Sequence, residues 1–169
     1  MRRAISLVAL LALCSGIARA SAPSVADLDA HSRATGNRLD VAMAVGERLF
    51  STKWPAQVLQ VEANQMGEHL VLGLHVSGVK FHAALDWAEF SGEVQSLISQ
   101  AFAAAPTAEE VDVWVTVPIS VGKGVIVSGD LAKPTTRTVY AISSRRGRHM
   151  TKNTFLDEDW ARSAFEKQQ

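Results

Sequence analysis

The sequence contains one cysteine, Cys14, and that residue lies in an N-terminal segment with the features of a secretory signal. A basic start is followed by an apolar stretch over residues 4–14 and by the small-x-small sequence ARA at 18–20. This order is typical of a signal peptide. We therefore expect residues 1–20 to be a Sec-type signal cleaved after Ala20, which predicts a periplasmic or secreted protein.

Cleavage at this position removes the only thiol of the chain. The mature protein is then expected to have no disulfide, no thiolate nucleophile and no cysteine-ligated metal. Its stability must come from an apolar core.

The mature chain also lacks a strong charge and a long apolar run. Loss of the signal lowers the number of Lys and Arg from 17 to 14 against 17 acidic residues, a net charge of about −3. This value favours neither nucleic acid nor a membrane surface as partner, and no later run approaches the ~20 apolar residues of a membrane span. We expect a flexible lead-in at 21–36, which is polar and without period, and a single domain at 37–169.

Familiar catalytic motifs are missing as well. The sequence has no GxSxG, HExxH, Walker or GxGxxG pattern, and its glycines are scattered among turns. We predict no cofactor, and the sequence favours a protein that is not an enzyme. A catalytic triad assembled by the fold stays open as an alternative.

Three helices are predicted from apolar periodicity and capping residues. The first has Asn37 as N-cap and ends before Pro55. The second begins with the capping box formed by Asp86 and Glu89, and it ends at Pro106. A short closing helix is expected over residues 156–166, and a stretch of acidic residues lies in its first turn.

Alternating residues predict strands between these helices. With turns at 66–67 and 77–78, residues 57–85 form a three-stranded meander in which Ala63 faces Leu70. Strands around a hairpin at 122–124 and over 135–143 complete the second half. The fold class predicted is α+β, an antiparallel sheet of about six strands in the order α-βββ-α-βββ-α, with helices packed on one face.

This register places His69, His75 and His82 on the sheet face away from the helices. A zinc site needs three or four converging ligands, and only two of these imidazoles come close together. We therefore predict no metal site, with weak metal binding through His75 and His82 as an alternative.

Two groups of residues remain as candidate binding sites. The first is a basic loop over residues 143–152, which we expect to hold an anionic ligand or an acidic partner through guanidinium contacts. The alternative is a solvated loop paired with the acidic residues 157–159. The candidate residues are Arg137 on the preceding strand, Arg145, Arg146, Arg148, His149 and Lys152.

The second candidate is Trp114. Its position in the alternating sequence places it with Asp112 and Thr116, opposite a face of valines. A tryptophan on an open sheet face marks a binding surface, whereas packing under the terminal helix is the structural alternative.

Together these features predict an exported soluble, non-catalytic binding or accessory protein. It would engage a protein partner or a small anionic ligand through the basic loop or the Trp114 face. The alternatives are an exported hydrolase without a visible motif, using Asp130, His82 or His149, and the weak metal binder described above.

Overall fold

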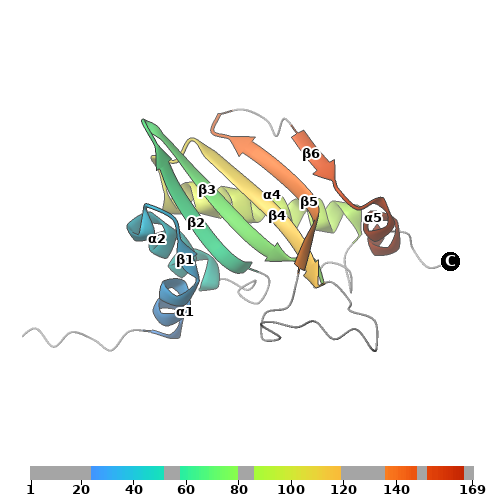
Figure 1. The fold of residues 1–169 in the computed structure, drawn as a ribbon, viewed down its shortest axis with the longest axis horizontal. Coiled ribbons are helices and arrows are strands. Elements are labelled where there is room, and N and C mark those ends of the chain that lie inside the picture. The colour runs from blue at the N-terminus through green and yellow to red at the C-terminus, as the bar shows by residue number, and fades with distance from the viewer. Residues whose placement is uncertain (1–23, 52–57, 80–85, 119–135, 148–151, 166–169) are drawn as a thin grey trace, which may run out of the picture.

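The computed structural model describes residues 24–51, 58–79, 86–118, 136–147 and 152–165 (Figure 1). The side chains of Ala26, 152–154 and Ala164 are not described. The described helices are α1 (Val25–Arg33), α2 (Leu39–Phe50), α4 (Trp87–Ala104) and α5 (Glu158–Phe165). The described strands are β1 (Ala34–Thr35), β2 (Val58–Met66), β3 (His69–Ser77), β4 (Glu110–Pro118), β5 (Thr136–Arg145) and β6 (Lys152–Phe155).

Strands β2 to β6 form a mixed sheet in chain order, and the two residues of β1 pair in parallel with β2 at its edge. The pairs β2–β3, β4–β5 and β5–β6 are antiparallel, whereas β3 and β4 are parallel. The α+β class is confirmed, but the prediction of a purely antiparallel sheet is wrong. Helix α4 lies between β3 and β4 in the chain and makes the long crossover that a parallel pair requires.

The predicted hairpin between the first two long strands is present, with its turn one residue later than expected. Met66 pairs with His69, so the turn residues are Gly67 and Glu68, and Ala63 pairs with Leu72. Gly67 has a φ of +63°, which a glycine at the first turn position adopts without steric cost. The register differs from the prediction by two residues, and the two faces of the hairpin are therefore unchanged.

The predicted third strand of the meander is not formed where it was expected to begin. Gly78 and Val79 are helical, and the second neighbour of β3 is β4. Residues 80–85 and the predicted 122–124 hairpin lie outside the described residues, while β1 and β6 were not predicted. The expected set of six strands is therefore not shown.

The core lies between the sheet and the helices that cover one of its faces, with α4 running behind the strands in the view of Figure 1. The alternate valines of β4 point into it, and each is at most 8% exposed. Opposite them, α4 contributes Phe90, Val94, Leu97 and Ile98, all buried. Each such side chain contributes about 1.5–3 kcal/mol when it leaves water.

Local signals set the ends of the helices. The capping box of Asp86 and Glu89 begins α4 as predicted. The N-cap predicted for Asn37 is wrong, because α2 begins at Leu39 and Asn37 bonds to β2 instead. Its Oδ1 accepts from the Gln65 amide at 2.7 Å, and its Nδ2 donates to the Gln65 carbonyl at 3.0 Å.

The described part of the expected lead-in, residues 24–36, is ordered into α1 and β1. Ser24 and Asp27 form a capping box, and Ala30 is fully buried. Ala30 packs on Gly46 of α2, where an added Cβ would lie 3.1 Å from the Ala30 Cβ. Arg33 adds a contact over the Phe50 ring and a hydrogen bond to the Val58 carbonyl. These contacts hold α1 in place but leave little apolar period in the sequence.

The C-terminal part agrees with the predicted strand and closing helix. Trp160 and Phe165 of α5 pack against Phe90 of α4, and Trp160 is 6% exposed. Among the described helices, none is both long and apolar enough to cross a membrane.

Candidate functional site

The sheet face opposite α2 and α4 carries no described helix, and we call it the open face (Figure 1). Its side chains come from alternate positions of neighbouring strands, because β-strand side chains alternate between faces. They are half-buried and mostly polar. The central members are Gln60, Glu62 and Asn64 of β2, His75 of β3, Asp112 and Trp114 of β4, and Ser143 of β5.

Trp114 lies at the centre of the open face, as the alternation of β4 predicts. Its indole stacks on the His75 ring, with centroids 4.9 Å apart and an interplanar angle of 28°. It also reaches over Gly73, where an added Cβ would come within 2.7 Å of the indole. Helix α5 packs on the other side of the sheet, against Phe90. Trp114 is therefore an open-face residue, and α5 does not cover it.

His75 is adjacent to a carboxylate but is half-buried. Its Nε2 lies 3.8 Å from Glu62 Oε2, which would favour the protonated ring. Burial nevertheless lowers the pKa of His75, and Glu62 opposes this effect only in part. The imidazole is therefore neutral at neutral pH, so His75 does not give Glu62 a positively charged partner. Asn64 orients Glu62 by donating to Oε1 at 2.8 Å.

Two carboxylates on β4 have opposite pKa shifts. The pKa of Glu110 is lowered, chiefly because Ser143 donates to it at 2.6 Å and also because Arg145 donates at 2.8 Å. Burial raises the pKa of Asp112, and the Glu110 carboxylate adds to this increase while Ser143 opposes it. The pair thus combines a carboxylate held ionised with a second one that holds its proton more tightly.

Three adjoining hollows cover the open face. The end hollow, about 810 Å³, lies where β3 and β4 begin and is lined by Met66, His69, Val71, Glu109, Glu110, Asp112, Arg145 and Arg146. The aromatic hollow, about 380 Å³, includes Asn37, Glu62, Asn64, Val71, Asp112 and Trp114. The β5 hollow, about 400 Å³, includes Glu110, Asp112, Trp114, Ser143 and Leu156. All three share Asp112, so they form one continuous strip.

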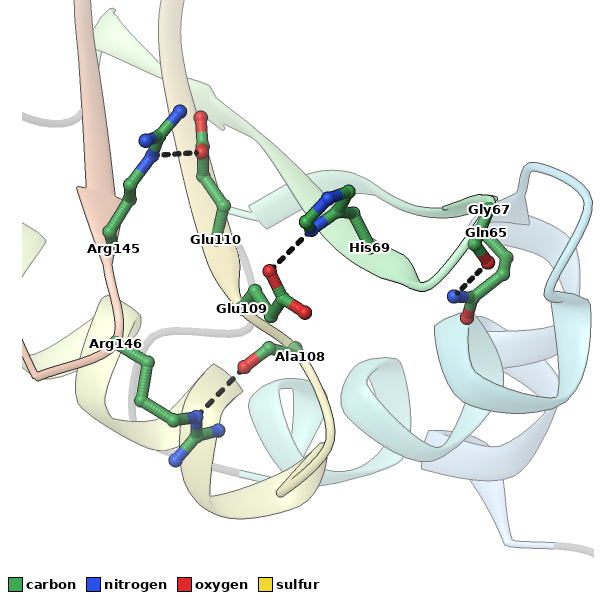
Figure 2. A network of polar contacts seen from close by, with 8 residues as sticks. All are labelled: Gln65, Gly67, His69, Ala108, Glu109, Glu110, Arg145 and Arg146. Atoms are coloured by element: carbon green, nitrogen blue, oxygen red, sulfur yellow. Dashed lines mark hydrogen bonds and ion pairs between the residues drawn. The ribbon is translucent and has the colours of Figure 1, made fainter.

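The two described arginines of the predicted basic loop, Arg145 and Arg146, do not point into one common site. Figure 2 shows Arg145 on Glu110, while Arg146 turns away toward the end of α4. Arg146 donates to three carbonyl oxygens of that segment, those of Phe102, Ala105 and Ala108, at 2.8 to 3.1 Å. Its guanidinium also lies 4.6 Å from the Phe102 ring centroid. Arg146 thus caps a helix.

The other members of that loop give no further support for an anion site. Arg137 forms an ion pair with Asp157, one of the acidic residues that the alternative had paired with the loop itself. Arg148 and His149 lie outside the described residues, as do His82 and Asp130. Lys152 begins β6, but its side chain is not described.

Metal binding also receives no support from the described residues. His69 pairs with Glu109 at the end of the sheet (Figure 2). Within the described ranges no three His, Cys, Asp or Glu side chains are grouped so that they could hold a metal ion.

Sequence reasoning identified Trp114 but missed most of the residues around it. Asp112 had been placed on the same face, so that signal was present in the alternation of β4. Glu62 was not predicted to lie near Trp114, because the parallel pairing of β3 with β4 is not visible locally. That pairing is what brings Glu62, Gly73 and Asp112 around one indole.

Comparison with protein-family models, with curated proteins and with solved structures finds no match to this chain. The assignment of the site therefore depends on its own geometry.

Proposed function

We propose that the protein is an exported, non-catalytic binding or accessory protein that engages its ligand on the open face. The observation that carries this proposal is the aromatic hollow, in which a half-buried tryptophan lies beside carboxylate and amide groups. Ligand sites typically combine a concave aromatic surface with a few convergent polar groups. The basic-loop version of the proposal has less support, because the described Arg145 and Arg146 are bonded within the fold.

A defined binding screen tests this proposal. The exported protein would be applied to immobilised peptides and oligosaccharides as wild type, as Trp114→Ala and as Asn64→Ala. Leu39→Ala is the control, because it removes an exposed apolar side chain from α2, away from the hollows. We expect a ligand class that wild type and control bind and that both hollow variants lose. Equal binding by correctly folded Trp114→Ala would contradict the proposal.

A hydrolase is the second candidate, favoured by one observation. Asp112 and Glu110 have pKa values shifted in opposite directions within the same concave surface, an arrangement that acid–base catalysis uses. Turnover of a glycoside or ester panel that is lost in both Asp112→Asn and Glu110→Gln would favour this candidate. Turnover that persists in either variant would exclude the pair as its catalytic centre.

A further inference from the structure

The aromatic hollow contains two carboxylates and no cation among its described lining residues. Glu62 lies on β2 and Asp112 on β4, with Gly73 between them on β3. Gly73 has no side chain, and the edge of the Trp114 indole lies over it instead. The hollow is thus a negatively charged recess crossed by three strands.

The described basic residues that line the adjoining end hollow are engaged elsewhere. Arg145 donates to Glu110, Arg146 to the carbonyls at the end of α4, and His69 pairs with Glu109. His75 is neutral at neutral pH for the reasons given above. Glu62 and Asp112 therefore have no Lys or Arg beside them among the described lining residues of the aromatic hollow. Arg145, whose charge acts on Asp112, lies outside this hollow and is bonded to Glu110.

Trp114 adds a second attraction for a positive group. Lysine or arginine binds over the face of an indole through the ring quadrupole, and a guanidinium also stacks on it. His75 covers one face of the indole, and Trp114 also lines both the aromatic hollow and the β5 hollow. A cation in the aromatic hollow would thus contact the indole and lie close to both carboxylates.

The shape of the surface distinguishes a chain segment from a free amine. The aromatic hollow alone is at the small end of the ~300–1,000 Å³ usual for ligand pockets. It continues into the end hollow through Val71 and Asp112, and into the β5 hollow through Asp112 and Trp114. An extended peptide can occupy such a strip from β2 to β5, whereas a small amine fills only its centre.

We propose that the open face binds a basic segment of a protein partner and that one arginine or lysine side chain of the segment enters the aromatic hollow. This inference rests on the proposed function and names the chemistry of its ligand. The cation lies between Glu62 and Asp112 against Trp114, and the flanking residues of the segment lie along the adjoining hollows.

The probe is a capped Gly-Ser peptide with one central arginine, titrated to millimolar concentration into ¹⁵N-labelled protein. The Trp114 indole N–H resonance, assigned by its loss in Trp114→Phe, reports binding. The same peptide with citrulline keeps the shape but removes the charge, and free agmatine keeps the guanidinium but removes the flanking chain. Glu62→Gln removes one carboxylate, and Glu47→Gln makes the same change on the exposed surface of α2 as the control.

We expect the arginine peptide to bind at least about fivefold more tightly than the citrulline peptide, which corresponds to ~1 kcal/mol. Glu62→Gln should weaken it by a similar factor and Glu47→Gln by less than twofold. Equal binding of the citrulline peptide would overturn the cationic inference, and equal binding of agmatine would overturn the assignment to a protein segment. If the arginine peptide fails while the screen finds another Trp114-dependent ligand, this inference falls and the proposed function stands.

Discussion

Arg145 and Arg146 are adjacent in the sequence, but their side chains have different surroundings. Arg145 makes an exposed ion pair with Glu110 at the open face. Arg146 bonds to carbonyl oxygens of the last turn and C-cap of α4, where helix carbonyls lack partners within the helix. Arg145 joins two strands, β5 and β4, that are already paired, whereas Arg146 joins the end of β5 to the end of α4.

This difference predicts unequal effects on stability. Arg146→Ala should lower the free energy of unfolding by about 1–3 kcal/mol, because three charge-assisted hydrogen bonds are lost. Arg145→Ala should lower the free energy of unfolding by less than ~1 kcal/mol, because exposed ion pairs usually contribute no more than this. Arg146→Lys should fall between wild type and Arg146→Ala, since lysine keeps the charge but not the fork of donors. Urea unfolding measures all three, and equal losses for both alanine variants would contradict the helix-capping role.

The two carboxylates of β4 predict opposite pH dependence. The Asp112 carboxyl faces Glu110, Ser143, Arg145 and Trp114. The folded state raises its pKa above the usual value of 3.8, so ionising this group at higher pH lowers the free energy of unfolding. Asp112→Asn should therefore be more stable than wild type at pH 7, by under about 1 kcal/mol because the side chain is half-exposed. The difference should disappear as the pH falls below the unfolded pKa of this group.

Glu110→Gln is the matched variant, with the opposite sign. The folded state lowers the pKa of Glu110 in the wild-type protein. The ionised carboxylate therefore stabilises the fold above the unfolded pKa of 4.5, and this contribution is lost as the pH falls through the folded pKa. Glu110→Gln should therefore be less stable than wild type at pH 7. Thermal melting between pH 3 and pH 8 measures both differences, and the same sign for both variants would show that the assigned environments are wrong.

Two of the helices begin with the same capping motif but hold different amounts of the core. In α1, Ser24 and Asp27 form the capping box, and one alanine of that helix is buried. In α4, Asp86 and Glu89 form it, and five residues of that helix are buried. Loss of an N-cap costs about 1 kcal/mol in either case.

The cost should be expressed locally in α1 and globally in α4. For Asp86→Ala we expect a lower melting temperature for the whole molecule. For Ser24→Ala we expect faster amide hydrogen exchange within residues 25–33 and little change in melting temperature, because this end opens without unfolding the sheet. Hydrogen exchange combined with thermal melting checks both. A fall for Ser24→Ala as large as that for Asp86→Ala would show that α1 belongs to the global unfolding unit.

The elements that the sequence predicted are those with local signals. Helix α4 has a capping box and a repeated apolar period, and the β2–β3 hairpin has a glycine at its turn. Helix α1 was missed because Ala30 is its one buried residue among the described side chains, which leaves no apolar period to recognise. The parallel pairing of β3 and β4 was missed because strand alternation fixes which face a side chain occupies but not which strand lies beside it.

The same limit applied to the candidate site. The alternation of β4 was enough to place Trp114 on the face without helices. The arginines looked like a site because they are close in sequence, but their acceptors, Glu110 and the end of α4, are more than thirty residues away. A charge run therefore predicts a ligand site only when its long-range partners are known.

At the scale of the whole molecule, one continuous apolar core joins both ends of the described chain. The buried cluster includes Ala30 of α1, Leu49 of α2, Leu97 of α4, Ile142 of β5 and Trp160 of α5. The sheet is also continuous from β1 to β6, so hydrogen-bonded strands join its two halves. A structure of this kind is expected to unfold in one cooperative step.

Two core substitutions at opposite ends test this cooperativity. Leu49→Ala should cost about 2–5 kcal/mol and Ile142→Val about 0.5–1.5 kcal/mol, because each leaves a buried cavity. If the core is one unit, each variant should shift the far-ultraviolet and the tryptophan-fluorescence transitions together, without broadening either. Separate transitions, with Leu49→Ala moving only one of them, would show that the α1–α2 end and the β5–α5 end unfold independently. In that case the aromatic hollow, which is built from β2, β3 and β4, would lie at the boundary between the two units, and occupation of the hollow by a ligand would stabilise both.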